Sequence, residues 1–203
     1  CLRHRGSRAR WRRARSLTIE GFNNRVTHVN DFVFDENNTC WMGTGLGLCA
    51  FDPKTGRLTA HENRENPLAN DIQDMVSDRA GFWLATANGL VFFDKKTRTF
   101  RSFFIEAPPS ETESFNHLRG LLQTRAGGIF TLNEKGIAGF ENGQLRQLCY
   151  LPYMNFTHIR SLAEDDQGFL WLKAFGELFK INPQTGAVMA RFECYGSYFV
   201  PTP

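Results

Sequence analysis

An all-β fold built from four stacked copies of one strand-rich unit is predicted by three features of the sequence. A turn followed by an aromatic anchor recurs four times, at spacings of 42, 47 and 41 residues. Short apolar stretches alternate with turns rich in Gly, Asp and Pro, which favours strands and excludes long helices. A repeat of this length cannot bury its apolar face alone, so its copies must stack. The anchors are Trp41, Trp83, Phe130 and Trp171.

The first strand of each unit is predicted at residues 29–34, 72–77, 118–123 and 159–164. Apolar residues stand at its first, fourth and usually fifth positions, which is typical of a strand covered on both faces. A turn follows, and Asp suits this turn because its carboxylate can accept bonds from nearby backbone N–H groups. The turn residues are Asp35, Asp78 and Asp165.

The second strand carries the anchor, and two further strands follow it. An aliphatic residue stands seven positions after each anchor: Leu48, Leu90, Ile137 and Leu178. A second turn, at residues 52–56 in the first unit and 182–186 in the last, leads into the fourth strand. Fourth strands are predicted at 58–61, 100–103, 145–148 and 188–191. Four short antiparallel strands per unit describe a blade of a β-propeller.

The chain therefore divides into blades at residues 29–71, 72–117, 118–158 and 159–195, preceded at 16–28 by the end of another blade and a lead-in loop. Residues 196–203 are predicted to be a truncated tail, where a further blade begins. Residues 1–15 hold seven Arg and no acid, and we expect them to be disordered or non-native to the fold. A basic segment can bind nucleic acid or anionic membranes. The rest of the chain has 17 basic and 21 acidic residues and is therefore slightly acidic, so no nucleic-acid partner is expected for the blades.

The five cysteines have no CxxC spacing, so a metal or redox motif is absent. Pairing Met42 with Cys49 across the turn places Cys40 and Cys49 diagonally on one face, slightly too far apart for a disulfide. All cysteines except Cys1 are expected to be buried thiols. The sequence has no apolar run of about 18 residues that would predict a transmembrane helix, and no secretory signal is visible.

The repeat resembles the two-component regulator propeller repeat over residues 17–195. The shared pattern is an apolar strand, then Asp-x-x-Gly-x-x-Trp-x-Gly-Thr-x-x-Gly-Leu, then aromatic-Asp-Pro-x-Thr-Gly. The first, second and fourth units match it specifically, whereas the third is degenerate. The second unit is one residue short before Trp83, and Gly176 stands one position early. Phe130, Asn133 and Ala174 replace the expected Trp, Thr and Thr, which predicts looser packing or altered turns.

The resemblance implies the extracytoplasmic sensor region of a hybrid two-component histidine kinase, with an oligosaccharide or other small ligand and no cofactor. It also implies closed rings of about seven blades in a parent protein anchored at the periplasmic face of the inner membrane. An open stack leaves sheet faces uncovered, so the four blades are expected to complete a ring with other blades of the parent or to pair with a second copy. The chain itself contains no phosphoacceptor domain or ATP site, so no enzymatic activity is expected of it.

Ligand-binding residues are predicted along one rim, where the chain enters each first strand. The residues directly before these strands are His28, Asp71, His117 and His158. Further candidates in the same loops are Arg25, Asn70, Asn116, Phe115 and Phe156. Three imidazoles and a carboxylate could hydrogen-bond a polar ligand, bind a metal, or form hydrogen bonds only with the backbone of their own loops. A single ion with bonds of roughly 2 Å would demand close convergence, so no metal is predicted. The loop from Glu106 to Phe115 is the longest of these loops.

No catalytic residue is predicted. The sequence lacks HExxH and GxSxG motifs, and the recurring Asp residues occupy a fixed turn register that structure alone requires. The glycine turns at 44–47 and 86–89 precede strands instead of helices, which excludes a phosphate-binding loop. Two alternatives remain open. One is a metal-dependent lyase similar to the streptogramin-inactivating propellers, using His28, His117 and His158; the other is a protein-interaction scaffold.

Overall fold

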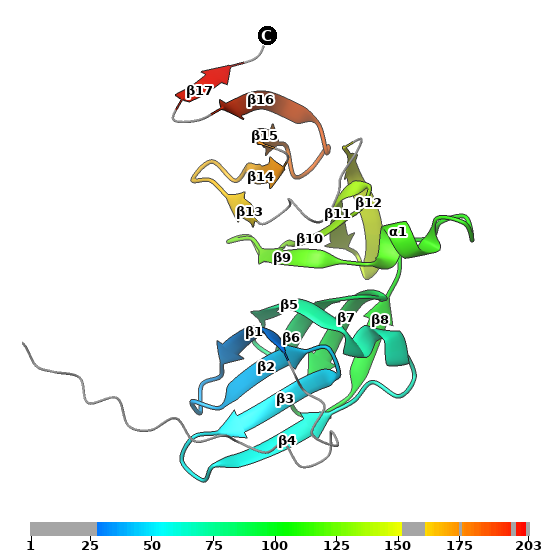
Figure 1. The fold of residues 1–203 in the computed structure, drawn as a ribbon, viewed down its shortest axis with the longest axis vertical. Helices are drawn as coiled ribbons and strands as arrows, with labels where there is room; N and C mark the ends of the chain where they lie inside the picture. The colour runs from blue at the N-terminus through cyan, green and yellow to red at the C-terminus, as the bar shows by residue number, and fades with distance from the viewer. Residues whose placement is uncertain (1–27, 152–160, 175, 196–197, 202–203) are drawn as a thin grey trace, which may run out of the picture.

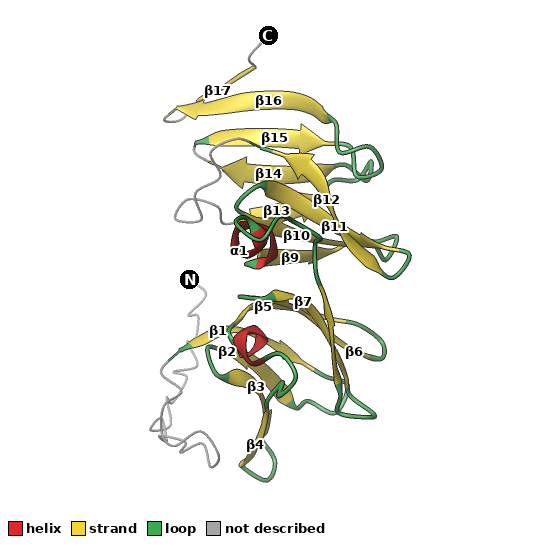
Figure 2. Ribbon diagram, turned by 90° about the vertical axis from the view of Figure 1, so that its right-hand side faces the viewer, coloured by secondary structure: helices red, strands yellow, loops and turns green. Residues whose placement is uncertain are grey.

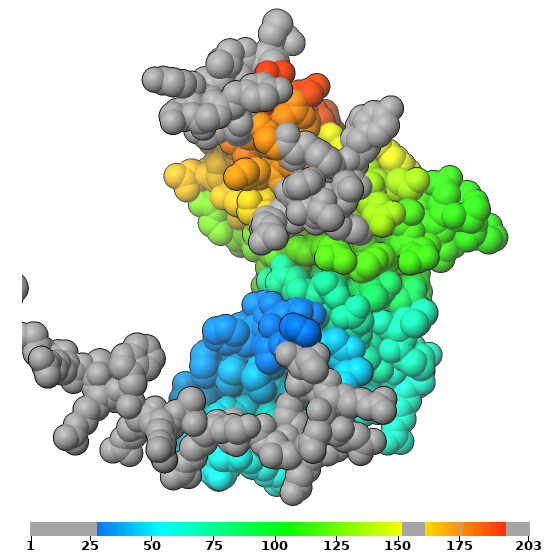
Figure 3. All heavy atoms as spheres, in the orientation of Figure 1, coloured from blue at the N-terminus to red at the C-terminus, as the bar shows by residue number. Residues whose placement is uncertain are grey.

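The computed structural model describes residues 28–151, 161–174, 176–195 and 198–201. These residues form four antiparallel sheets that follow one another in chain order along an arc (Figures 1 and 3). The two short helices among them are η1 (Pro67–Asn70) and α1 (Thr112–Asn116). Neither is long and apolar enough to cross a membrane. The all-β prediction of four-stranded blades is thereby confirmed.

Each sheet has its strands in sequence order. Blade 1 contains β1 (Val29–Phe34), β2 (Cys40–Thr44), β3 (Gly47–Asp52) and β4 (Arg57–His61). Blade 2 contains β5 (Ile72–Ser77), β6 (Gly81–Thr86), β7 (Gly89–Asp94) and β8 (Phe100–Phe103). Blade 3 contains β9 (Arg119–Gln123), β10 (Ile129–Asn133), β11 (Gly136–Glu141) and β12 (Gln144–Tyr150). Blade 4 contains β13 (Ser161–Glu164), β14 (Leu170–Ala174), β15 (Glu177–Ile181) and β16 (Val188–Tyr195).

A fifth strand, β17 (Tyr198–Pro201), pairs antiparallel with β16 in the sheet of blade 4. The sequence suggested that another blade begins in this segment, whereas the backbone extends the existing sheet. Because Tyr195 pairs with Tyr198, the two strands form a tight hairpin.

The first strands of successive blades are neighbours. β1 contacts β5, β5 contacts β9, and β9 contacts β13. This is the arrangement of innermost strands in a propeller, and it places the loops that enter these strands at one end. Figure 2 shows η1 and α1, which precede β5 and β9, on the same side of the stack.

Aromatic rings fill the first two interfaces between blades. The ring of Trp41 in blade 1 lies 5.0 Å from that of Phe82 and 5.5 Å from that of Phe93 in blade 2. The Trp83 ring in blade 2 lies 4.7 Å from Phe140 in blade 3. The core between blades 3 and 4 is aliphatic at its centre, with Leu132, Ile137, Cys149 and Leu151 packed against Leu170, Leu172, Ala174 and Ile181.

The Asp turn fixes the anchor in two blades. In blade 1, Asp35 accepts backbone N–H bonds from Asn37 and Thr39, and the indole of Trp41 donates to its second oxygen at 2.9 Å. Asp165 and Trp171 repeat this arrangement in blade 4 at 2.8 Å. The Trp171 indole bond lowers the pKa of Asp165 to about 2. In blade 2 the turn is one residue shorter, and the second Asp78 oxygen accepts from Gln123 of blade 3.

The predicted hairpin register of blade 1 is confirmed, because Met42 pairs with Cys49. Cys40, Cys49 and Cys149 are free thiols, of which Cys49 and Cys149 are buried and Cys40 is half-buried. Burial raises the pKa of Cys49 to about 11, so this thiol is unreactive at neutral pH. The Cys194 side chain lies outside the described part of the structure.

Candidate functional site

Two of the four rim residues, Asp71 and His117, occupy equivalent places at the entry to blades 2 and 3. Each directly follows a short helix, and its backbone N–H closes that helix by donating to a carbonyl three or four residues earlier. The Asp71 carboxylate accepts a 2.7 Å bond from the side chain of Gln73. Burial and the positive charge of Arg119 lower the pKa of His117, and the negative charges of Asp71, Glu134 and Glu113 partly oppose that shift.

The remaining predicted rim residues are only partly placed. His28 is exposed at the edge of blade 1. His158, Arg25 and Phe156 lie outside the described residues. The structure therefore places Asp71 and His117 at equivalent entry positions of successive blades, while the four-residue rim remains a prediction.

Asn70 and Asn116 clamp the loops that enter blades 2 and 3. The side-chain oxygen of Asn70 accepts from the N–H of Asn63 at 2.7 Å, and its amide donates to the carbonyl of the same residue at 3.1 Å. Asn116 makes the same pair of bonds to Ile105, at 2.7 and 3.0 Å. Both ends of each amide are thus occupied within the protein, which gives these residues a loop-positioning role.

Phe115 anchors the long loop to blade 3. Its side chain is buried, with the ring of Tyr150 in edge contact at 6.2 Å and the ammonium of Lys135 5.6 Å from its ring centre. Lys135 in turn pairs with Glu111 at 2.7 Å. The loop is consequently held by α1 against β10 and the turn that follows it, and the Tyr150 side chain beside it is exposed.

Metal binding finds no support in the part of the chain that the structure describes. No three His, Cys, Asp or Glu side chains within that part are grouped to hold an ion. Asp71 and His117 supply one carboxylate and one imidazole, which is fewer than the three protein ligands of a catalytic zinc site.

Two carboxylates on the inner strands were missed by the sequence analysis. Asp31 of β1 and Asp74 of β5 both accept from the N–H of Met75, at 3.0 and 2.8 Å. The second oxygen of Asp74 accepts from Leu121 of β9 at 2.7 Å. Each carboxylate therefore ties its blade to the next one. Burial, followed by the neighbouring Asp31, raises the pKa of Asp74 to about 7. The recurrence of Asp at the third position of two successive first strands was the available signal.

Comparison with known proteins supports the fold. Neither a family model nor a curated protein matches the sequence. Among solved structures, the extracellular domain of BT4673 from B. thetaiotaomicron, described as a one-component or hybrid two-component system, is similar with a TM-score of 0.64 and 23% identity. That likeness covers 86% of this chain and 23% of the other. The extracellular domain of BT3049 from the same organism follows with a TM-score of 0.59 and 17% identity, over 80% of this chain and 23% of that one.

An enzyme shares the same architecture. Virginiamycin B lyase from Staphylococcus aureus is similar with a TM-score of 0.61 and 14% identity, over 80% of this chain and 54% of the lyase. The chain thus spans about a quarter of the two B. thetaiotaomicron domains and about half of the lyase. These likenesses agree with the repeat resemblance found in the sequence, and they identify the fold as an array of four β-propeller blades.

Proposed function

We propose that this chain is part of an extracytoplasmic sensor region of a hybrid two-component system and contributes to binding a small polar ligand of the oligosaccharide class. The observation that carries the proposal is the likeness of 86% of the chain to the extracellular domain of BT4673. The parent protein would be anchored at the inner membrane with these blades on its periplasmic face.

The rim supports a binding role better than a catalytic one. Asp71 and His117, at the entries to successive blades, offer a carboxylate and an imidazole whose pKa is lowered, and these groups can accept and donate bonds to sugar hydroxyls. The clamps made by Asn70 and Asn116 hold the backbone that carries both side chains. A signal then requires the ligand to favour one arrangement of the blades and their neighbours over another.

Calorimetric titration of the intact protein with neutral oligosaccharides tests the proposal. Asp71→Ala and His117→Ala should each weaken binding about tenfold, because each removes a hydrogen-bonding partner at the rim. Glu62→Gln, an exposed change outside the entry positions, is the matched control. Failure of the unaltered protein to bind any neutral or acidic oligosaccharide would contradict the sensor assignment in this form.

A lyase remains the second candidate, supported by the likeness to virginiamycin B lyase. It requires a bound metal. Metal analysis of the intact protein, with the double variant His117→Ala and His158→Ala as comparison, separates the two functions. A stoichiometric metal that the double variant loses would favour the lyase.

A further inference from the structure

A hollow of about 500 Å3 opens between blade 3 and two turns of blade 4, away from the rim. Its floor is the face of blade 3 that carries Phe130, Gly139 and Arg146, which are directly paired across β10, β11 and β12. Its other wall is formed by Glu164 and Gly168 before β14 and by Gln184 before β16. This volume falls within the range of roughly 300–1,000 Å3 that small-ligand sites occupy.

The hollow exists because blade 3 has small residues where blade 2 has large ones. The corresponding row in blade 2 is Trp83, Phe92 and Arg101. There the Trp83 and Phe92 rings lie 4.9 Å apart and fill the space in front of the sheet. Phe130 replaces the Trp and Gly139 replaces the Phe, so the same space is left open in blade 3.

Two glycines leave the Phe130 ring uncovered. A Cβ on Gly128 would lie 3.0 Å from the ring, and a Cβ on Gly139 would lie 3.3 Å from it. Neither glycine is among those with a positive φ, so the backbone does not require glycine at either position. Their common effect is to expose an aromatic face, which is partly buried and points toward blade 4.

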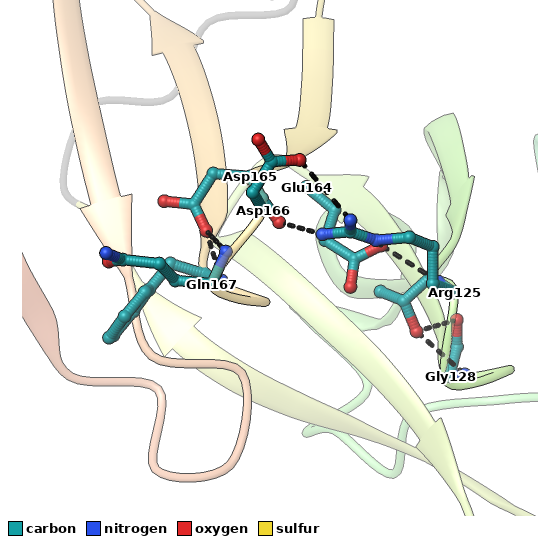
Figure 4. A network of polar contacts seen from close by, with 8 residues as sticks. Arg125, Gly128, Glu164, Asp165, Asp166 and Gln167 are labelled. Carbon is teal, nitrogen blue, oxygen red and sulfur yellow. Dashed lines mark hydrogen bonds and ion pairs between the residues drawn. The ribbon is translucent and has the colours of Figure 1, made fainter.

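The polar groups around the hollow balance in charge. Arg125 of blade 3 reaches across to blade 4, where it approaches Glu164 and Asp166 at 3.4 Å and donates to the carbonyl of Asp165 (Figure 4). Of these residues only Glu164 lines the hollow, and Arg125 compensates its charge. Arg146 and Glu141, both exposed, contribute opposite charges on the floor. A neutral ligand is therefore favoured over an anion or a cation.

We propose that this hollow is a binding site for a neutral sugar ring, which stacks its apolar face on Phe130 and offers its hydroxyls to Arg146, Glu141 and Gln184. Aromatic floors with a few fixed polar groups suit such amphipathic rings. The ligand class rests on the proposed function, whereas the position of the site rests on the contacts of blades 3 and 4. The site is distinct from the rim at Asp71 and His117, since none of its lining residues enters a first strand from the rim side.

The test compares variants of the intact protein by calorimetry with xylohexaose, mannohexaose and maltohexaose. Gly139→Phe restores the side chain that fills blade 2 and should weaken binding at least tenfold. Arg146→Ala should weaken binding severalfold, and this variant replaces Gly139→Phe in the test if Gly139→Phe does not fold. Arg101→Ala, the same register position in blade 2, is the matched control and should leave binding unchanged.

The possible outcomes separate this site from the rim. If the unaltered protein binds a hexasaccharide and Gly139→Phe and Arg146→Ala bind it equally well, the hollow is not the site, while the sensor function stands. If His117→Ala retains binding and the hollow variants lose it, the hollow is the site and the rim assignment fails. Absence of binding to all three hexasaccharides, or a preference for trigalacturonic acid, overturns the neutral-sugar assignment.

Discussion

The interface between blades 1 and 2 and the interface between blades 3 and 4 are built from the same repeat but by different means. Between blades 1 and 2, the Trp41 indole packs on two Phe rings, and the Asp31 carboxylate accepts a bond from the N–H of Met75. Between blades 3 and 4, Phe130 leaves a hollow. Gly120 occupies the position in blade 3 that Asp31 and Asp74 occupy in blades 1 and 2. Phe130 and Gly120 of the degenerate third unit thus lie at the interface with blade 4, whereas Asn133 bonds within blade 3.

This difference shows that a repeat can lose the large side chains that pack between blades and still fold as a blade. The aliphatic centre between blades 3 and 4 is buried. The ion pairs of Arg125 with Glu164 and Asp166 join these two blades in place of the missing inner carboxylate. A cavity is costly when nothing occupies it, because the atoms that line it lose packing partners. The hollow between blades 3 and 4 opens to solvent, so it does not carry the cost of an empty buried cavity and is accessible to a ligand.

Replacing the anchors with Ala should show the largest contrast between the two interfaces. Trp41→Ala removes a nearly buried indole and its bond to Asp35, so it should lower the free energy of unfolding by about 3–5 kcal/mol. Phe130→Ala removes a ring that already faces the hollow, and its cost should be about 1–2 kcal/mol. Urea unfolding measures both. Equal losses would mean that Phe130 is as well packed as Trp41, which would contradict the difference between the two interfaces.

The repeat made most of the fold predictable. Turn chemistry at Asp35 and Asp165, together with the hairpin register at Cys49, follows from local side-chain bonding and from period-two alternation, which are encoded within a few residues. The degeneracy of the third unit was also visible as Phe130 and Asn133. These substitutions predicted looser packing or altered turns, but not a hollow, because a hollow depends on what blade 4 places opposite Phe130.

The rim was less predictable than the strands. The sequence placed Asn70 and Asn116 among ligand contacts, whereas the structure uses both to hold loop backbone. The partners in these bonds lie seven and eleven residues away, beyond the range of local turn patterns. Asp31 and Asp74 escaped notice for a similar reason: their bonds reach the neighbouring blade, which alternation within one strand does not reveal.

Asp74, which accepts from Leu121 across the interface between blades 2 and 3, gives that interface a pH dependence. The folded-state pKa of Asp74 is about 7, well above its ordinary value, because the group is buried next to Asp31. The folded chain therefore holds a proton that the unfolded chain releases between about pH 4 and 7. The stability contributed by this group is complete below about pH 4, falls as pH rises from about 4 to about 7 by at most about 1.4 kcal/mol per pH unit, and changes no further above that.

Asp74→Asn is the corresponding test, because the amide mimics the protonated acid and keeps an oxygen for the Leu121 N–H. The variant should flatten the decrease in stability between pH 4 and 7, as measured by urea unfolding at several pH values. Hydrogen exchange at Leu121 should lose its pH dependence beyond the intrinsic rate, while exchange at Leu172 in blade 4 should be unaffected. Unchanged pH dependence in the variant would show that Asp74 is already ionised in the folded protein.

The smallest expected contrast concerns the ion pairs that bridge the outer turns. Arg125 in blade 3 contacts a well-covered Glu164 and also reaches Asp166, whereas Lys95 in blade 2 meets a largely exposed Glu36 at 3.0 Å. Arg125→Ala should therefore cost about 1 kcal/mol, and Lys95→Ala less, because solvent screens an exposed pair. Unfolding at 0.05 and 1 M salt compares them. The Arg125 effect should persist better at high salt, because Glu164 is shielded by blade 3. If both effects vanish together, the outer network is ordinary surface pairing, and the aliphatic centre alone joins blades 3 and 4.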